Sequence, residues 1–266
     1  MIPKIIHYCW IGNKPLPKLA KKCIASWKKI MPDYEIKLWN ENNYDFQKNE
    51  FMRNAYVNKK WAFVSDYARF DIIYNYGGIY LDTDVEVLKT FDEFLKYPAF
   101  CGFDSNHFVS FGLGFGAEKG NKVIKEIMEQ YETLSFDLDI QTINMLHGCN
   151  KKILKKWEND KMIPSPILQT QVLRQKYNLI NNNTHQSLNG IEVFPCDYFC
   201  PKDNKGIPTI NSNAYSTHWY MASWYSLSDK IKSKILILFK KIFGEKAVFF
   251  IKQKIKEIFF KTKYIK

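Results

Sequence analysis

The chain has 266 residues, of which 46% are hydrophobic and 16% are aromatic. This length and apolar content allow one large packed domain or two small ones, and they exclude a wholly disordered chain. The formal net charge is +12, but the tail over residues 229–266 holds 12 Lys against 3 Asp and Glu. Because a nucleic-acid enzyme spreads basic surface around its active site, a charge concentrated in a tail argues against a nucleic-acid partner.

Strand and helix patterns alternate along most of the chain. In chain order, the sequence predicts a strand over 2–10, a helix between Pro17 and Pro32, a strand over 34–39, a helix over 61–76, strands over 79–87 and 98–103, a helix over 121–134 and a strand over 191–194. This alternation predicts an α/β fold with a mostly parallel, Rossmann-like sheet flanked by helices. We expect one domain over 1–228 and a helical tail over 229–266.

The redox state and the cellular location are predicted from what the sequence lacks. It shows no signal-peptide pattern at its N-terminus and no run of about 18 apolar residues. Its six cysteines form no Cys-x-x-Cys pair, and the spacing of Cys196 and Cys200 is a poor match to a zinc site. We therefore expect reduced thiols, a cytoplasmic protein and no membrane-spanning helix.

The strongest chemical signal lies where an apolar strand runs into Asp82-Thr-Asp84. Positions i and i+2 of an extended chain point the same way, so both carboxylates would share one face at the carboxyl end of the strand. Such a pair can hold a hard divalent cation and leave coordination positions open for a diphosphate. The bare pattern also arises by chance, and Asp137-Leu-Asp139 is a second match that we interpret as a solvated helix start. On the pattern alone, a metal–phosphate site and a capped loop are equally open.

Four blocks occur in a fixed order, namely Ile2–Gly12, Ala62–Arg69, Gly77–Asp84 and His218–Trp224. Together they resemble glycosyltransferase family 32, which includes fungal initiating mannosyltransferases and bacterial capsular-polysaccharide transferases, and the catalytic domain of the large glucosylating toxins. The resemblance covers roughly residues 2–225. It implies a GT-A fold, a nucleotide-sugar donor, a Mn²⁺ or Mg²⁺ ion and retention of anomeric configuration. We expect a UDP- or GDP-hexose as the donor and a glycan or polyprenyl-linked oligosaccharide as the acceptor.

The resemblance also implies the metal ligands. Asp84 would bind the metal directly, and Asp82 would contact it through water or bind the ribose. His218 would be the third ligand, because a neutral imidazole suits Mn²⁺, although a structural histidine is the alternative.

The alternating glycines of Ser110–Gly116 fit neither a Rossmann nor a Walker loop. We interpret that segment as flexible backbone near the donor or acceptor sugar.

The resemblance further implies the donor contacts. Asp66 and Arg69 would bind hydroxyls of the donor sugar, which a carboxylate beside a guanidinium fork can do. The alternative is a surface ion pair between residues three apart on a helix. Trp10 would stack on the nucleobase, with a core tryptophan as the alternative. The remaining contacts to the nucleotide would come from Ile11, Tyr80, Ser223 and Trp224.

Two other function classes stay open. A metal-dependent nucleotidyl- or phosphotransferase would also use paired aspartates, but it would not need the blocks around Trp10, Asp66 and His218. A non-enzymatic binder of membrane surfaces would depend on the tail instead. The tail reads as two basic amphipathic helices broken at Gly244, a pattern typical of attraction to anionic lipid at a membrane interface. We expect a peripheral position on the inner face of the cell membrane, with packing of both helices on the body as the alternative.

Truncation after Ser228 is expected to abolish binding to anionic vesicles and to leave donor hydrolysis unchanged, because every candidate site residue precedes the tail. Each lysine near an anionic surface contributes about 1 kcal/mol, and added salt screens the attraction. Vesicle co-sedimentation at two salt concentrations, beside a hydrolysis assay, measures both effects. A truncated chain that unfolds or stops hydrolysing the donor would place the tail in the core and contradict the membrane role.

Overall fold

The computed structural model describes residues 1–133, 163–201, 209 and 211–221, which belong to one compact unit, Met1–Met221. The candidate contacts Ser223 and Trp224 and the amphipathic tail over 229–266 lie outside the described residues. The roles expected of them therefore stay predictions.

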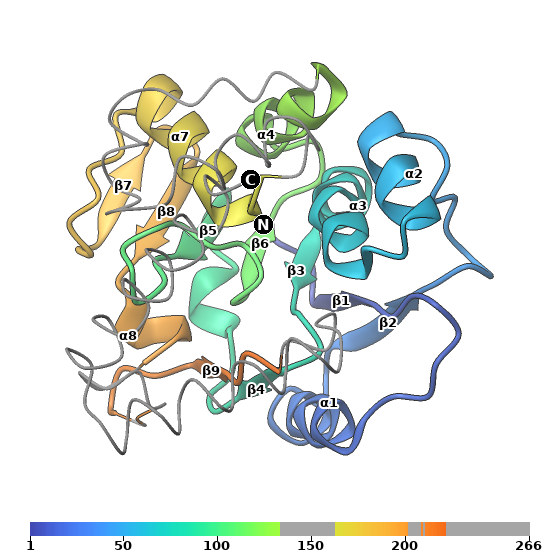
Figure 1. The fold of residues 1–266 in the computed structure, drawn as a ribbon. Helices are drawn as coiled ribbons and strands as arrows, with labels where there is room; N and C mark the ends of the chain where they lie inside the picture. The colour runs from blue at the N-terminus through green and yellow to red at the C-terminus, as the bar shows by residue number, and fades with distance from the viewer. Residues whose placement is uncertain (134–162, 202–208, 210, 222–266) are drawn as a thin grey trace, which may run out of the picture. The chain divides into compact units, whose positions relative to one another are not determined.

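A seven-stranded sheet forms the centre of the described body (Figure 1). In spatial order its strands are β2 (Glu35–Trp39), β1 (Ile5–Cys9), β3 (Gly78–Tyr80), β6 (Phe115–Ala117), β5 (Ala99–Gly102), β8 (Ile191–Phe194) and β7 (Gln186–Leu188). Strands β2, β1, β3, β5 and β8 run in one direction, whereas β6 and β7 run the other way. The predicted mostly parallel sheet is confirmed. Parallel strands bring their carboxyl ends to one edge, where α/β proteins bind ligands.

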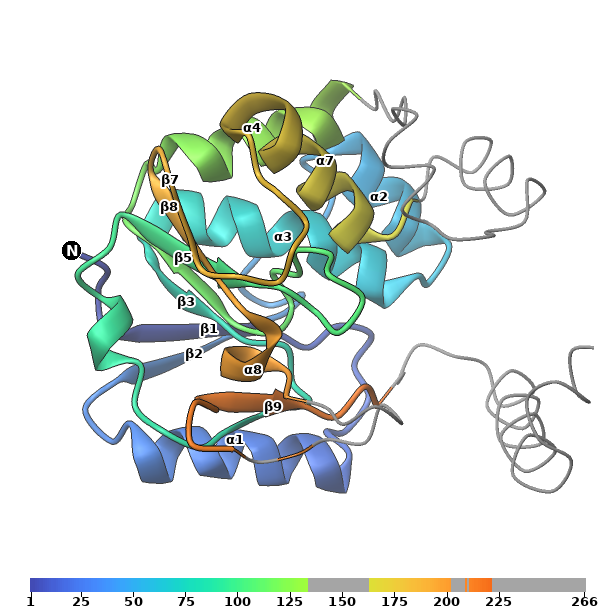
Figure 2. The same ribbon diagram turned by 90° about the vertical axis from the view of Figure 1, so that its left-hand side faces the viewer.

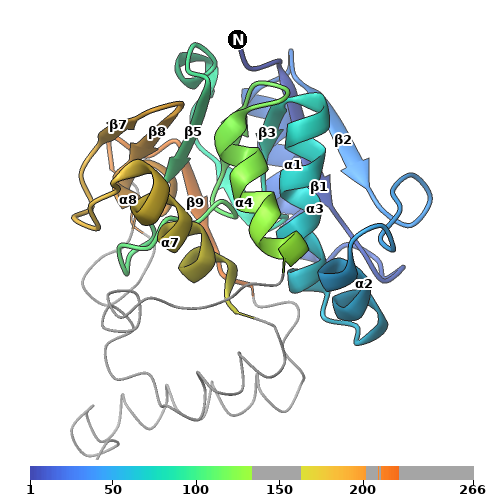
Figure 3. The ribbon, with the colours of Figure 1, turned by 90° about the horizontal axis from the view of Figure 1, so that it is seen from above.

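Helices cover both faces of this sheet (Figure 2). One face carries α2 (Glu50–Val57), α3 (Trp61–Tyr76), α4 (Lys122–Thr133) and α7 (Ser165–Tyr177). The other face carries α1 (Lys18–Ile30), the 3₁₀ turn η1 (Asp92–Phe94), the short α8 (Cys196–Phe199) and a ribbon of β4 (Val85–Val87) and β9 (Ser216–His218). Seen from above, α4 lies between α3 and α7 (Figure 3). None of the helices in the described ranges has both the length and the apolarity needed to cross a bilayer.

The single strand predicted over 79–87 is wrong. The chain forms β3, turns, and then forms β4, which pairs with β9 in a separate sheet. The Val85 amide donates to the Asp82 carbonyl at 3.0 Å, which closes the turn. Asp-Thr-Asp favours this geometry, because aspartate side chains bond nearby backbone amides in turns. Asp82 and Asp84 therefore lie in a turn, and the argument that places residues two apart on one face of a strand does not apply to them.

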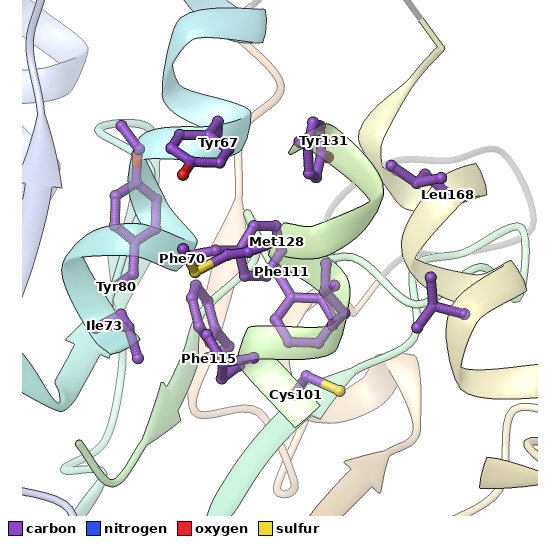
Figure 4. Close-up of a cluster of buried hydrophobic side chains, with 14 of the residues drawn as sticks. Tyr67, Phe70, Ile73, Tyr80, Cys101, Phe111, Phe115, Met128, Tyr131 and Leu168 are labelled. Carbon is purple, nitrogen blue, oxygen red and sulfur yellow. The ribbon is translucent and has the colours of Figure 1, made fainter. Parts of the chain in front are cut away.

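An aromatic cluster joins α3, α4 and the segment that leads into β6 (Figure 4). The Phe70 ring centre lies 5.1 Å from that of Phe111 and 5.6 Å from that of Phe115, and the last two are 4.9 Å apart. Tyr131 of α4 packs against Phe70 at 6.2 Å. Burial of each large apolar side chain contributes about 1.5–3 kcal/mol. Because Phe111 and Phe115 lie within Ser110–Gly116, this cluster anchors the glycine-rich segment against α3.

The cysteines that the structure describes are free thiols. Burial raises the pKa of Cys9 and of Cys23 to about 12, so both are uncharged at neutral pH. Cys196 is half-buried and its thiol accepts from the Asn183 amide group at 3.3 Å. Burial also raises the pKa of the Cys196 thiol. A thiol with a raised pKa is a poor nucleophile, so these cysteines are inert packing groups rather than reactive ones.

Candidate active site

Three segments meet at the carboxyl edge of the sheet. Helix α3 carries Asp66 and Arg69, and the turn after β3 carries Asp82 and Asp84. The third segment is β9, in which His218 stands opposite Val85 of β4. The local sequence explains this meeting, because Gly77 and Gly78 have φ values of +68° and +105° and so reverse the chain from α3 directly into β3.

Arg69 is the centre of the site. Its Nη2 lies 3.0 Å from Oδ1 of Asp66 and 3.4 Å from Oδ1 of Asp82. Its Nε donates to the Ser65 carbonyl at 3.1 Å, and the guanidinium carbon lies 5.1 Å from the centre of the Tyr80 ring. Arg69 is 5% exposed and Asp66 is 8% exposed. The alternative of an exposed surface ion pair is therefore wrong.

Burial and the guanidinium act in opposite directions on the carboxyl groups. Burial raises the pKa of Asp66 to about 6, although Arg69 lowers it. Burial also raises the pKa of Asp82, again against the effect of Arg69. Burial would lower the pKa of Arg69, but the two carboxylates hold it above its ordinary value. The guanidinium thus stays charged beside two carboxyl groups that bind protons more tightly than usual.

Asp84 is held by residues in β9 and directly after it. Its Oδ1 lies 3.2 Å from Nε2 of His218, and its Oδ2 accepts from the Met221 amide at 2.8 Å. Its carbonyl accepts from the Trp219 amide at 3.0 Å. Burial alone would raise the pKa of Asp84, but His218 and the Met221 amide hold it below its ordinary value. Asp84 is therefore ionised at neutral pH.

The side-chain oxygen and nitrogen atoms of these groups are suitable ligands for a hard divalent cation. Carboxylate oxygens are ligands for Mg²⁺ and Mn²⁺, and an imidazole adds preference for Mn²⁺. Among the described residues, no cluster of three or more such groups is already assembled for a metal ion. The reason is that Asp82 faces Arg69, whereas Asp84 faces His218. Direct binding of a cation by Asp84 and His218, with Asp82 joining through water or by turning away from Arg69, therefore stays a prediction.

The glycine-rich segment packs directly on Asp82. The Asp82 amide donates to the Gly112 carbonyl at 3.4 Å. A Cβ on Gly112 would lie 2.3 Å from Oδ2 of Asp82 and 3.0 Å from Nη1 of Arg69. Gly112 is not among the glycines with positive φ, so close approach alone requires glycine here. Residues 111–116 are buried, and the segment forms a packed wall of the site.

Sequence reasoning missed two polar residues of α7 that border the site. Ser165 hydrogen-bonds Asp66, and its hydroxyl lies 3.0 Å from that of Tyr131. Gln169 donates to the Ser165 hydroxyl and accepts from the Phe111 amide at 3.2 Å. Both residues are buried. Their spacing of one helical turn was the only signal, and it is too common to identify a site.

The candidate nucleotide contacts differ in accessibility. Trp10 is half-buried directly after β1, and its indole N–H donates to the Lys14 carbonyl. Ile11 is 8% exposed and Tyr80 is 1% exposed. Tyr80 therefore supports Arg69 through its ring, and a direct contact to a nucleotide would require it to move. Trp10 and Ile11 follow β1 at the edge where the other site residues meet, and their contact with a nucleotide stays a prediction.

Comparison with known proteins identifies the family. The family described as a glycosyltransferase sugar-binding region containing a DXD motif matches residues 17–101, which include Asp82 and Asp84. An uncharacterized glycosyltransferase of Acanthamoeba polyphaga mimivirus is 35% identical over 235 residues, which are 84% of this chain and 84% of the relative. The chain belongs to this glycosyltransferase family. Its sheet, with the DXD pair at the carboxyl edge, is the predicted GT-A fold.

Other similar proteins match over less of their length or at lower identity. Inositol phosphoceramide mannosyltransferase 3 of Schizosaccharomyces pombe is 29% identical over 58% of this chain. The chain spans 44% of that relative and 27% of mannosyl phosphorylinositol ceramide synthase SUR1 of Saccharomyces cerevisiae. Among solved structures, PaToxG glycosyltransferase is 20% identical with a TM-score of 0.47, over 66% of this chain and 69% of its own. The galactosyltransferase LgtC is 11% identical with a TM-score of 0.41, over 86% and 94%.

Gly112→Ala is expected to leave this glycosyltransferase folded and to lower its turnover by about tenfold or more, because the added methyl displaces the Asp82 carboxylate. The matched control is Gly102→Ala, whose Cβ would lie 2.5 Å from Cδ2 of Phe199 in the core. The control should lower the melting temperature without a selective loss of turnover. Thermal unfolding and donor hydrolysis measured on both variants check this pair. Equal turnover in the two variants at matched stability would contradict the assigned role of Gly112.

Asp66→Asn is expected to change how the stability of the protein depends on pH. The pKa of Asp66 is about 6 in the folded chain against an ordinary 3.8, so between these values the folded state binds more protons than the unfolded state. The resulting stabilisation is complete below pH 3.8 and is lost as the pH rises through about 6. Relative to the variant, the wild type should therefore lose stability over this range. Parallel curves in urea unfolding from about pH 4 to about pH 7 would contradict the raised pKa.

Proposed function

We propose that this chain transfers a hexose from a nucleotide-sugar donor, a UDP- or GDP-sugar, to a glycan acceptor with the help of Mn²⁺ or Mg²⁺. The observation that carries the proposal is the meeting of two polar pairs at one edge of the sheet, Asp66 with Arg69 and Asp84 with His218. Asp82 stands between the two pairs, since it lies 3.4 Å from Arg69 and precedes Asp84 by two residues in the same turn. One pair suits a sugar, and the other suits a metal-bound diphosphate.

Asp84 and His218 would hold the cation, and Asp82 would join them through water. When bound, the divalent cation neutralises the charge that develops on the departing diphosphate. Asp84 suits this role because its pKa lies below its ordinary value, which keeps the carboxylate ionised. The bonds to Asp84 from the amides of Trp219 and Met221 fix the orientation of the residue before any ligand arrives.

Asp66 and Arg69 would orient the donor sugar. The carboxylate can accept from sugar hydroxyls, and the guanidinium can donate to them. Their 3.0 Å contact and their burial restrict both side chains, so little conformational entropy is lost when a sugar binds. Gly112 lets the main chain pack directly against Asp82 and Arg69, so both side chains keep the positions from which they would face the sugar.

The resemblance to family 32 supports retention of anomeric configuration. Asp66 and Asp82 are the carboxyl groups beside the proposed sugar position, and Arg69 is paired with both. A carboxylate held in such a pair is a weak nucleophile. We therefore favour attack by the acceptor on the face from which the diphosphate departs, within a short-lived ion pair.

The names of relatives suggest the first substrates to test. Similarity to an inositol phosphoceramide mannosyltransferase supports mannose as the first donor sugar. For the acceptor we propose a glycan or a polyprenyl-linked oligosaccharide, in the synthesis of a bacterial capsule or another surface polysaccharide. The basic tail over 229–266 supports contact with an anionic membrane surface, where such an acceptor would be carried.

Asp84→Asn tests this function. The variant keeps the size of the side chain but removes its charge, so metal-dependent donor hydrolysis should fall by about a hundredfold or more while the fold is kept. Glu86→Gln is the matched control, because Glu86 lies two residues away and its carboxylate contacts Lys22 and the Trp219 indole rather than Asp84 or His218. Hydrolysis of UDP- and GDP-hexoses is measured with Mn²⁺, with Mg²⁺ and with chelator. Full activity of Asp84→Asn, or of the wild type in excess chelator, would contradict the proposal.

A further inference from the structure

His7 is a buried polar residue of β1 that the proposed reaction does not use. It is 0% exposed, and its strand pairs in parallel with β2 on one side and with β3 on the other. A buried imidazole without hydrogen-bond partners would destabilise the fold. Both of its ring nitrogens have partners, and the two partners come from different segments of the chain.

The hydrogen bonds of the ring select one tautomer. Nε1 of Trp39 lies 3.0 Å from Nδ1 of His7, and the Gly77 carbonyl lies 2.9 Å from Nε2. An indole N–H can only donate, so Nδ1 is the acceptor and Nε2 carries the proton that it donates to Gly77. Burial lowers the pKa of His7 to about 4, which keeps the ring neutral and this arrangement intact at neutral pH.

The main chain of His7 holds a second point on the same segment. Its carbonyl accepts from the Leu81 amide at 3.1 Å. His7 therefore binds both ends of the segment Gly77–Leu81, which directly precedes Asp82. The fit is close, because a Cβ on Gly78 would lie 2.9 Å from Nε2 of His7 and 2.7 Å from the Ile5 carbonyl.

The same segment joins the two halves of the candidate site. The Gly77 amide donates to the Ile73 carbonyl at 2.8 Å and so ends α3, the helix that carries Arg69. Strand β3 follows at once, but it has only three residues, Gly78–Tyr80. Because β3 is so short, its pairing with β1 fixes the register of this segment only weakly. The bond from His7 to Gly77 adds a fixed point at the start of the segment, where the chain leaves α3.

We propose that the His7 imidazole is a positioning residue, whose bond to Gly77 fixes where the chain leaves α3 and thereby where Asp82 and Asp84 stand relative to Arg69. The inference rests on the proposed function, in which the two aspartates bind a metal and a diphosphate. The contact between Arg69 and Asp82 is already 3.4 Å long, so a small shift of the segment would break it. His7 acts on the reaction only through this geometry and touches no reacting group.

Two variants of His7 separate positioning from simple packing. The amide nitrogen of glutamine takes the place of Nε2, so His7→Gln can keep the donor to Gly77. The amide of asparagine takes the place of Nδ1, so His7→Asn can keep only the bond with Trp39. Each variant loses one of the two ring bonds, and both should lower the melting temperature by similar amounts. Ile6→Val is a further control, because it destabilises the same strand through packing on the opposite face without removing a hydrogen bond.

The experiment measures Mn²⁺ binding by the loss of the free-ion electron paramagnetic resonance signal, together with kcat and KM for donor hydrolysis. His7→Gln and Ile6→Val should bind Mn²⁺ as the wild type does, whereas His7→Asn should bind it about tenfold more weakly. His7→Asn should also lower kcat more than it raises KM, since the displaced aspartates act on the departing diphosphate. Equal Mn²⁺ binding by folded His7→Asn and His7→Gln would overturn the inference. A wild type that binds no Mn²⁺ would instead overturn the proposed function, so the two failures are distinguishable.

Discussion

The structure depends on one buried guanidinium. Arg69 is 5% exposed and lies between the carboxylates of Asp66 and Asp82. Removal of a charge from water costs several kcal/mol, about as much as a good ion pair returns, and loss of one partner leaves an uncompensated buried charge. The helix, the turn after β3 and the Tyr80 ring must therefore all be in place together. This requirement explains why Gly112 has no side chain and why Ser165 holds Asp66 from α7.

The two aspartates of the DXD motif belong to different surroundings. Asp82 belongs with Arg69, where burial raises its pKa, and Asp84 belongs with His218, where its pKa lies below the ordinary value. The turn between β3 and β4 produces this division, because it directs neighbouring carboxylates towards different elements. One carboxyl group can thus remain with the guanidinium while the other stays ionised, as the proposed metal ligand would need to be. A straight strand would have placed both in one environment.

Local patterns in the sequence were enough to predict much of the fold. The helix over 61–76 has the predicted bounds, and so does the strand over 191–194, because Gly-Gly and Pro end these elements sharply. Helix α7 was missed because its first half is buried on all sides and shows no apolar stripe. Strand β9 has three residues and exists only through its pairing with β4, which no local pattern can reveal.

The candidate site was predictable only in part for the same reason. Asp82 and Asp84 were selected from the Asp-x-Asp pattern after an apolar strand, and Asp66 and Arg69 from a block that resembles a family. Their mutual distances, and the parts played by Ser165 and Gly112, depend on contacts between segments far apart in the sequence. Burial of Arg69 also excluded an exposed surface ion pair, and burial cannot be read from a spacing of three residues.

The ribbon of β4 and β9 has a consequence for synthesis of the protein. Asp84 is bound by Trp219 and Met221, which follow it by 135 and 137 residues, and His218 is paired with it as well. A chain still emerging from the ribosome can form α3, β3 and the Arg69 cluster long before these partners exist, because domains form as the chain is made from its N-terminus. Closure of so long a loop also costs chain entropy, which only the contacts made after closure can offset. The proposed site of Asp84 and His218 would thus remain incomplete until almost all of residues 1–221 had been translated.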